Sequence, residues 1–363
     1  MKKTLVILFL LLNGAYAYAA PSDTDRQKAI NDALTDVETN GSSIHKNSER
    51  ILNSTEPKQA PSTHKRNFEL AFQTDSYNYT TGDKWPYYYS KKYTTSDKIK
   101  RNGTLNGLFA STSWYGPLHT FNDFWGGGEI PNFARLEAEL SDGKSSYSSY
   151  VSGKLRGISS WNFDARLLIG YDYALTHATD LTLYIGGAYQ RYSHRDGGWV
   201  DFIVNDFARY TTITNQYYLP IGAETHTALN EDWDVNVKLE GDIVLAGNVA
   251  YHLNDITGTF QGTDLGTGQI VTITPKEANS SLNGGFGIRT SLKIIRKYKY
   301  CDFYIEPFLK FLYLNQSEKV QARFLGTNGK TYVSANPDGS PNKALWDAKN
   351  TTIDLGARAG VQF

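Results

Sequence analysis

Hydrophobic and polar residues alternate along most of this chain, and residues 351–363 show the pattern over their whole length. One face is apolar and holds Ile353, Leu355, Ala357, Ala359, Val361 and Phe363. The other face holds Asp354, Gly356, Arg358, Gly360 and Gln362. Successive side chains of a β-strand point to opposite faces, so this period predicts a strand with one apolar and one polar face.

The same alternation predicts about ten strands from residue 67 to the last residue. They cover residues 68–73, 104–115, 132–140, 161–173, 181–189, 217–224, 233–245, 282–294, 303–313 and 351–363. The inward face of residues 104–115 is ambiguous in the sequence. Pro307 departs from the strand pattern, because proline has no N–H to donate to a ladder.

The predicted connections alternate between short and long. The turns after Tyr173, Leu229 and Ile294 are brief. The stretches after Tyr77, Leu140, Tyr192, Leu245 and Leu314 are long and polar, with loops predicted over residues 77–101, 141–159, 193–212, 247–276 and 316–349. This alternation is typical of outer-membrane barrels. Residues 116–131 fall where the alternation predicts a short turn, but the segment is long, and the pattern does not explain its length.

The predicted fold is all-β: a closed, antiparallel transmembrane β-barrel of about ten strands over residues 67–363. The alternative is a secreted β-sandwich. It is disfavoured because the apolar faces are uniform while the opposite faces carry charges, which a barrel places in its lumen.

Residues 1–66 differ from the rest. A charged start, a short apolar core and the motif Ala17-Tyr18-Ala19 predict a signal peptide over residues 1–19. Residues 20–66 are polar and predict a periplasmic N-terminal extension, helical or disordered, with one amphipathic helix within residues 23–38. A short coiled coil or partner-binding helix is the alternative.

Composition excludes several classes of protein. The chain has 363 residues, with 37 basic and 37 acidic side chains, so it has no basic excess for a nucleic-acid partner. One cysteine, Cys301, allows neither an internal disulfide nor a zinc site of four thiolates. The scattered histidines suggest no metal site, and we expect no cofactor.

The terminal strand resembles the C-terminal signal strand of bacterial outer-membrane barrels, which ends on an aromatic residue. This resemblance implies that Phe363 and Val361 form an assembly signal for the barrel assembly machinery. It also implies an outer-membrane location, and an even strand number then places both termini in the periplasm.

The inward faces of the predicted strands carry charges of both signs. They are Arg135, Glu137, Glu139, Asp164, Arg166, Asp172, Glu224, Lys238, Glu240, Asp242, Arg289, Glu306, Lys310, Asp354 and Arg358. A barrel of about ten strands has a narrow lumen, and buried charges must pair. We therefore predict an ion-paired plug and not a general porin, with a narrow gated channel as the alternative.

Two long segments are rich in aromatic and basic residues. The candidates for surface recognition are Trp85, Tyr87, Tyr88, Tyr89, Lys91, Lys92, Trp199 and Phe202. Tyrosine and tryptophan give large contact areas at low entropic cost. We expect such loops to bind a surface ligand, as adhesins do, or to meet the phosphates of lipopolysaccharide.

Barrels of this size include the omptin proteases, which this chain resembles in strand number and loop layout. That resemblance implies an Asp–His pair facing a pair of aspartates at the outer rim. His252 with Asp255 lies near a rim, as do His194 with Asp196, and Asp201 with Asp206. No stretch reproduces the omptin signatures, so a protease or another rim hydrolase is the alternative to a non-enzymatic role.

Three segments carry a further resemblance. They are residues 162–170 (NFDARLLIG), 184–189 (YIGGAY) and 217–222 (YYLPIG). They resemble a family of proteobacterial outer-membrane β-barrel proteins without assigned activity, over roughly residues 67–363. The resemblance implies a barrel in the outer membrane and leaves the ligand open. A structural or recognition role at the cell surface is the resulting expectation.

Overall fold

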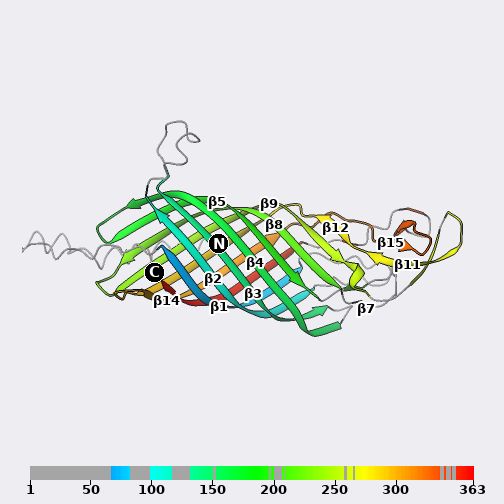
Figure 1. The fold of residues 1–363 in the computed structure, drawn as a ribbon, viewed down its shortest axis with the longest axis horizontal. Coiled ribbons are helices and arrows are strands. Elements are labelled where there is room, and N and C mark those ends of the chain that lie inside the picture. Colours follow the sequence, from blue (N-terminus) through cyan, green and yellow to red (C-terminus); the bar gives the residue numbers. More distant parts are fainter. Residues whose placement is uncertain are drawn as a thin grey trace, which may run out of the picture. The chain divides into compact units, whose positions relative to one another are not determined.

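The computed structural model describes residues 67–81, 99–116, 131–149, 153–195, 198–199, 207–208, 210–256, 260–264, 266–335, 339–340, 345 and 349–363. Ten long strands form a closed antiparallel barrel (Figure 1). They are β1 (Phe68–Thr81), β2 (Lys100–Tyr115), β3 (Phe133–Ser149), β4 (Gly153–Ala174), β5 (Thr179–His194), β8 (Thr211–Ala228), β9 (Trp233–His252), β13 (Gly285–Arg296), β14 (Asp302–Leu314) and β17 (Asn350–Gln362). Each pairs with its neighbours in the chain, and the β1–β17 pair closes the ring. The predicted fold class is confirmed.

Alternation decides which side chains enter the lumen. Along β1, Glu69, Gln73 and Asp75 are buried, whereas Phe68 and Phe72 are exposed on the outer surface. The inward face of β2, which the sequence left open, carries residues such as Leu105 and Phe109, both 3% exposed. The polar faces thus point into the barrel and the apolar faces point out.

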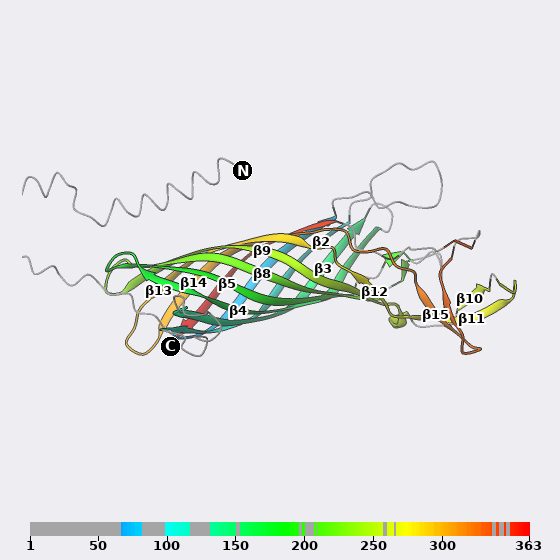
Figure 2. The same ribbon diagram turned by 90° about the horizontal axis from the view of Figure 1, so that it is seen from above.

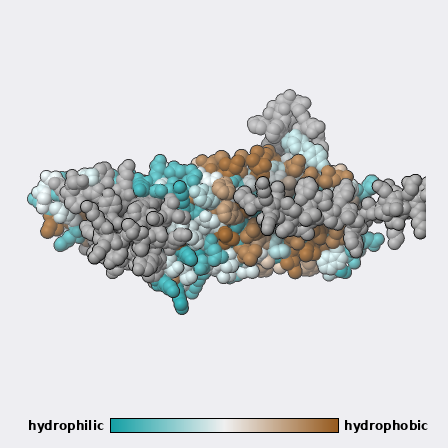
Figure 3. Space-filling model, turned by 180° about the vertical axis from the view of Figure 1, so that it is seen from behind, coloured by the Kyte–Doolittle hydropathy of each residue, from teal (hydrophilic) through white to brown (hydrophobic). Residues whose placement is uncertain are grey.

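The outer surface divides sharply into an apolar part and a polar part. Phe72, Leu108 and Leu140 pair across β1, β2 and β3 and are 76%, 49% and 55% exposed. Two residues further along each strand, the next outward row is Thr74, Asn106 and Asp142. Figure 3 shows hydrophobic side chains gathered over one end of the barrel and hydrophilic ones beyond them. We call this apolar part the belt.

The end of the barrel below the belt carries the short connections and is called the turn end. Residues 175–178, 229–232 and 297–301 connect β4 to β5, β8 to β9 and β13 to β14. In the second turn, the Asn230 Oδ1 atom accepts hydrogen bonds from the backbone N–H groups of Asp232 and Trp233, at 2.9 and 3.0 Å. The short turns are as predicted, because small polar side chains bond locally to the backbone.

Several strands continue beyond the belt, which corrects the predicted loop over residues 141–159. The β3–β4 ladder runs on from Ser141↔Asn162 to Ser149↔Gly153. The sequence here is mostly serine, glycine and lysine, with Tyr147, Leu155 and Ile158 as isolated apolar or aromatic residues, so hydrophobic alternation does not reveal a strand. Ladder hydrogen bonds do not require apolar side chains, and inward contacts such as Ser145 to Ser160, 3.0 Å between hydroxyl oxygens, join the two strands.

The opposite end of the barrel, the loop end, carries further strands where long loops were predicted. They are β6 (Gly198–Trp199), β7 (Phe207–Ala208), β10 (Phe260–Thr263), β11 (Ile270–Lys276), β12 (Ala278–Ser281), β15 (Arg323–Gly326) and β16 (Thr331–Val333). A short 3₁₀ helix, η2 (Leu253–Asp255), follows β9. The order β10-β11-β15-β16 makes a small sheet that we call the head (Figure 2). In both ribbon views the head lies at the end away from the C-terminus.

The head has a hydrophobic core of its own. Ile273 and Phe324 pack with Tyr251, Leu253 and Ala322, and all are buried. The segments between β9 and β13 and between β14 and β17 therefore fold together over the loop end. The sequence predicted loops there because each strand is short, and because the pairing that joins the two hairpins, β11 with β15, is between segments far apart in the chain.

Within the described residues, no helix is long and apolar enough to cross a membrane. The predicted signal peptide and the N-terminal extension, residues 1–66, lie outside the described part of the chain.

Candidate functional site

Charged side chains fill the barrel at the level of the belt. Arg166 on β4 reaches Glu240 on β9, with 2.7 Å between Nη1 and Oε1, and also contacts Glu137 on β3. Lys238 lies 3.6 Å from Glu137 and 3.3 Å from Glu240. Because β4 and β9 are not neighbours in the sheet, these ion pairs cross the lumen.

Arg135 anchors one side of this network. Its guanidinium binds both carboxylate oxygens of Glu224 on β8, at 2.6 and 3.2 Å. The Asn236 amide donates to the same carboxylate, and Arg135 also donates to the Ser113 hydroxyl at 2.9 Å. A two-point contact of this kind fixes the guanidinium plane as well as its charge.

Arg289 on β13 anchors the other side. It donates to Asp242 at 2.6 Å and to Asp164 on β4 at 2.9 Å. The Tyr218 hydroxyl joins the two, since it accepts from Arg289 at 2.6 Å and donates to Asp164 at 2.7 Å. These hydrogen bonds join Asp242, Arg289, Tyr218 and Asp164 into one buried group, in which the Asp242 Oδ1 atom alone has no hydrogen-bond partner among the described residues.

A second network surrounds Glu139 on β3. Lys310 on β14 donates to both of its oxygens at 2.8 Å, Arg358 on β17 donates at 2.9 Å, and Gln73 donates at 2.7 Å. Arg358 also lies 3.5 Å from Glu306. The ring of Phe109 lies under the Arg358 guanidinium, 4.0 Å from its centroid.

Among the pairs that the sequence analysis missed is Lys293 with Glu69. Lys293 donates to Glu69 at 2.7 Å, and Gln362 bonds to the same carboxylate. Lys293 and Glu69 lie on the inward face by simple alternation, because their chain neighbours Leu292 and Phe68 point outward. The signal was available, but neither residue was placed among the inward charges.

We call the two networks and the Lys293–Glu69 pair the plug. Most of the predicted inward charges lie in it and are enclosed, with Glu137 and Glu139 each 4% exposed. Two predicted members lie elsewhere. Asp172, near the turn end, accepts a hydrogen bond from Thr182 at 2.6 Å. Asp354 lies above the plug, facing a cavity.

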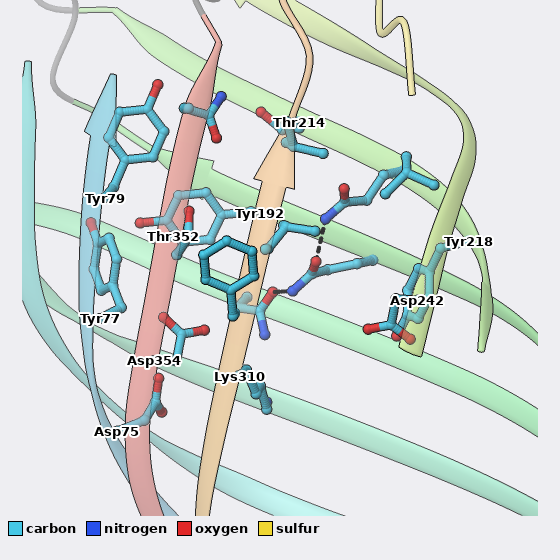
Figure 4. A pocket seen from close by; sticks show the side chains of 18 of the residues that line it. Asp75, Tyr77, Tyr79, Tyr192, Thr214, Tyr218, Asp242, Lys310, Thr352 and Asp354 are labelled. Atoms are coloured by element: carbon cyan, nitrogen blue, oxygen red, sulfur yellow. Dashed lines mark hydrogen bonds between the residues drawn. The ribbon is translucent and has the colours of Figure 1, made fainter. Parts of the chain in front are cut away.

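The cavity lies in the lumen between the plug and the loop end, and has a volume of about 90 Å³. Its walls include Tyr77, Tyr192 and Leu105 together with Asp75 and Asp354 (Figure 4). A buried site needs roughly 10–15 Å³ of such space for each water, so several waters or a small molecule fit.

The described rim histidines have local partners. His252 Nδ1 lies 3.6 Å from Glu277, and Asp255 accepts hydrogen bonds from Thr211. His194 is 4% exposed and lines the cavity. Asp196, Asp201 and Asp206 lie outside the described residues. Among the described residues, no group of three or more histidine, cysteine or acidic side chains is arranged to hold a metal ion.

The predicted recognition residues Trp85, Tyr87, Tyr88, Tyr89, Lys91, Lys92 and Phe202 also lie outside the described part of the chain. Trp199 belongs to β6, which pairs with β7. The recognition prediction therefore stays a prediction for these residues.

The two predicted assembly-signal residues lie at the turn end. Phe363 is 52% exposed, and its backbone exchanges hydrogen bonds with Phe68, at 2.9 and 3.3 Å. The two rings lie 6.3 Å apart between centroids. Val361 pairs with Leu70 on β1 and Phe303 on β14.

Comparison with known proteins gives no family model that matches and no matching curated protein. Solved structures with a similar fold include the outer-membrane protease OmpT from Escherichia coli, at 9% identity and a TM-score of 0.44, covering 84% of this chain and 99% of that one. The translocator domain of the autotransporter NalP from Neisseria meningitidis has 10% identity and a TM-score of 0.31, covering 89% and 97%.

A variant of the monoaromatic hydrocarbon channel TodX has 7% identity and a TM-score of 0.28, covering 84% of this chain and 93% of that one. The neighbours are barrels with different activities, and identities this low say nothing about which activity this chain has. The function must be argued from its own residues.

Proposed function

We propose that this protein is a bacterial outer-membrane barrel with a closed lumen that displays the head at the cell surface for recognition or adhesion. The belt supports the membrane location. A contiguous band of exposed leucine, isoleucine and phenylalanine side chains on a monomer needs an apolar surrounding. Strands spanning a bilayer need ~9–11 residues each, and the barrel strands are longer than this.

The observation that carries the proposal is the position of the plug below the head. Ion pairs that cross the lumen oppose a diffusion channel, since general porins use ~16 strands to leave a water-filled passage. What remains for contact with other molecules is the outer surface beyond the belt. There the chain builds a second core, although the barrel does not need one for closure.

Orientation follows from the connections. Outer-membrane barrels have short periplasmic turns and long external loops. In this proposal the turn end faces the periplasm with the C-terminal strand and its assembly signal, Phe363 and Val361. The loop end and the head then face outward, towards lipopolysaccharide and surface ligands.

The head presents apolar side chains to solvent. Ile270 on β11 is 71% exposed and Val333 on β16 is 51% exposed. These two positions lie on different strands of the head sheet, so they probe two separate parts of its surface. They give the recognition proposal two residues to test.

We expect the variant that combines Ile270→Asp with Val333→Asp to lose binding to bacterial or host cells and to immobilised glycans. A charge placed at the centre of an apolar contact is unfavourable when the contact excludes water. The measurement is retention of fluorescently labelled, refolded protein on whole cells and on a glycan panel.

The matched control is Leu229→Asp. Leu229 is 59% exposed but lies in a turn at the other end of the barrel. It should bind as the unmodified protein does. Equal binding by the head variant and the control would contradict the recognition proposal, and so would a lack of binding by the unmodified chain.

A further inference from the structure

The cavity above the plug contains two acidic side chains on neighbouring strands. Asp75 on β1 is 5% exposed, and Asp354 on β17 lies diagonally across the β1–β17 ladder, opposite Tyr77. Figure 4 shows the two carboxylates close together at the wall of the cavity. Like charges held this close are unfavourable unless a positive charge lies between them.

Two cations near these acids, Lys310 and Arg289, bind other acids. By register Lys310 is the direct neighbour of Asp354, yet its ammonium donates to both oxygens of Glu139 in the plug. Arg289 also lines the cavity, and it donates to Asp242 and Asp164. Among the described residues, no ion pair within 4.0 Å includes Asp75 or Asp354, and the Asp354 Oδ1 atom is buried without a hydrogen-bond partner.

The charges of the described plug and cavity do not balance. The acids are Glu69, Asp75, Glu137, Glu139, Asp164, Glu224, Glu240, Asp242, Glu306 and Asp354. The cations are Arg101, Arg135, Arg166, Lys238, Arg289, Lys293, Lys310 and Arg358. With His194 counted as neutral, ten acids face eight cations. Asp75 and Asp354 are the two of these acids that have no ion pair within 4.0 Å among the described residues.

The rest of the cavity wall suits an organic cation. Tyr77 and Tyr192 pack edge to face at 5.7 Å between ring centroids, beside Tyr79. Aromatic faces attract ammonium groups. Leu105 and Val244 add apolar surface to the same cavity, which an alkyl chain can contact.

We propose that this cavity binds a small alkylamine, whose ammonium group lies between Asp75 and Asp354 and whose alkyl stem contacts the tyrosine and leucine side chains. The amine supplies positive charge that the lumen lacks. A metal ion fits less well, because no described group of three or more histidine, cysteine or acidic residues is arranged to hold one. This inference does not rest on the recognition role of the head.

The test uses the full chain refolded in detergent, with isothermal titration calorimetry of butylamine and of 1,4-diaminobutane. We expect saturable binding of at least one amine. The variant that combines Asp75→Asn with Asp354→Asn should weaken that binding at least tenfold, because a buried charge pair is lost. Asparagine keeps the shape of aspartate, so the change removes charge with little change in packing.

The control is Asp142→Asn, which removes an exposed acid from the outer surface of β3 and should change the dissociation constant less than about twofold. A gel-mobility shift on boiling verifies that each variant is folded. Two results would overturn the proposal: no saturable binding of either amine, or the same affinity in the double variant. In either case the cavity holds only water, with the two carboxyl groups neutralised by protons.

Discussion

Glu139 shows at the scale of one residue why the lumen is closed. Its two oxygens accept hydrogen bonds from Lys310, Arg358 and Gln73. These three residues lie on three different strands, none of which is β3. Taking charges out of water is costly, and only complete pairing offsets the cost. The carboxylate therefore acts as a junction, and its loss leaves two cations buried without their main partner.

Glu139→Gln should lower the free energy of unfolding by about 3–5 kcal/mol, the range for breaking one side of a buried ion pair. The measurement is urea unfolding of the refolded barrel in detergent micelles, followed by tryptophan fluorescence. Glu231→Gln, in the exposed turn between β8 and β9, is the control and should change the value by less than about 0.5 kcal/mol. Equal midpoints for the two variants would show that the Glu139 network does not stabilise the barrel.

Individual inward residues were predictable from alternation, but their partners were not. Asp354 and Asp164 look alike in the sequence, since each alternates with apolar neighbours. One faces the cavity and the other binds Arg289, because the strands of a barrel are staggered. The same stagger brings Lys293 to Glu69, a pair that no spacing along the chain indicates.

At the scale of the strand, the apolar segments were predicted correctly and the polar ones were not. Residues 161–173 alternate and lie in β4, but β4 begins at Gly153, inside a predicted loop. The part beyond the belt has polar residues on both faces, so its pattern is that of a loop. Its strand state comes from pairing with β3, a tertiary effect that local sequence does not record.

The prolines of the barrel have a visible consequence at this scale. The ladder between β13 and β14 passes from Ser291↔Phe308 to Ile294↔Ile305 and lacks the pairs around Pro307. The β5–β8 ladder likewise passes from Ile185↔Ile221 to Ala188↔Tyr218, around Pro220. Because proline has no N–H to donate, each of these two strands loses ladder pairing to one of its neighbours next to the proline.

Leu355→Arg tests whether the belt is in lipid. Leu355 is 63% exposed in β17, so in water the change is mild. In a bilayer an arginine facing the hydrocarbon core costs about 2–4 kcal/mol. We expect that loss of unfolding free energy in lipid vesicles, measured by urea titration.

Val333→Arg is the matched control, because Val333 is 51% exposed but belongs to the head. It should change the unfolding free energy by less than about 0.5 kcal/mol. If the two arginine variants were equally stable in vesicles, the belt would not be in contact with lipid.

At the scale of the whole molecule, the barrel, plug and head divide the chain into parts with different tasks. In the proposed function, the barrel and belt hold the protein in a membrane, the plug fills the lumen, and the head provides a surface beyond the membrane. The barrel could be predicted because it repeats one pattern ten times. The head could not, because its core joins Ile273 and Phe324, residues that lie far apart in the sequence.

The most direct test of a closed membrane barrel is conductance of the refolded chain in planar lipid bilayers. The same sample is first run on a gel with and without boiling, which verifies the barrel by its change in mobility. The account predicts a mobility shift and no steady open channel. A large, steady conductance would contradict the plug. No mobility shift, in a protein that is soluble without detergent, would contradict the membrane barrel itself.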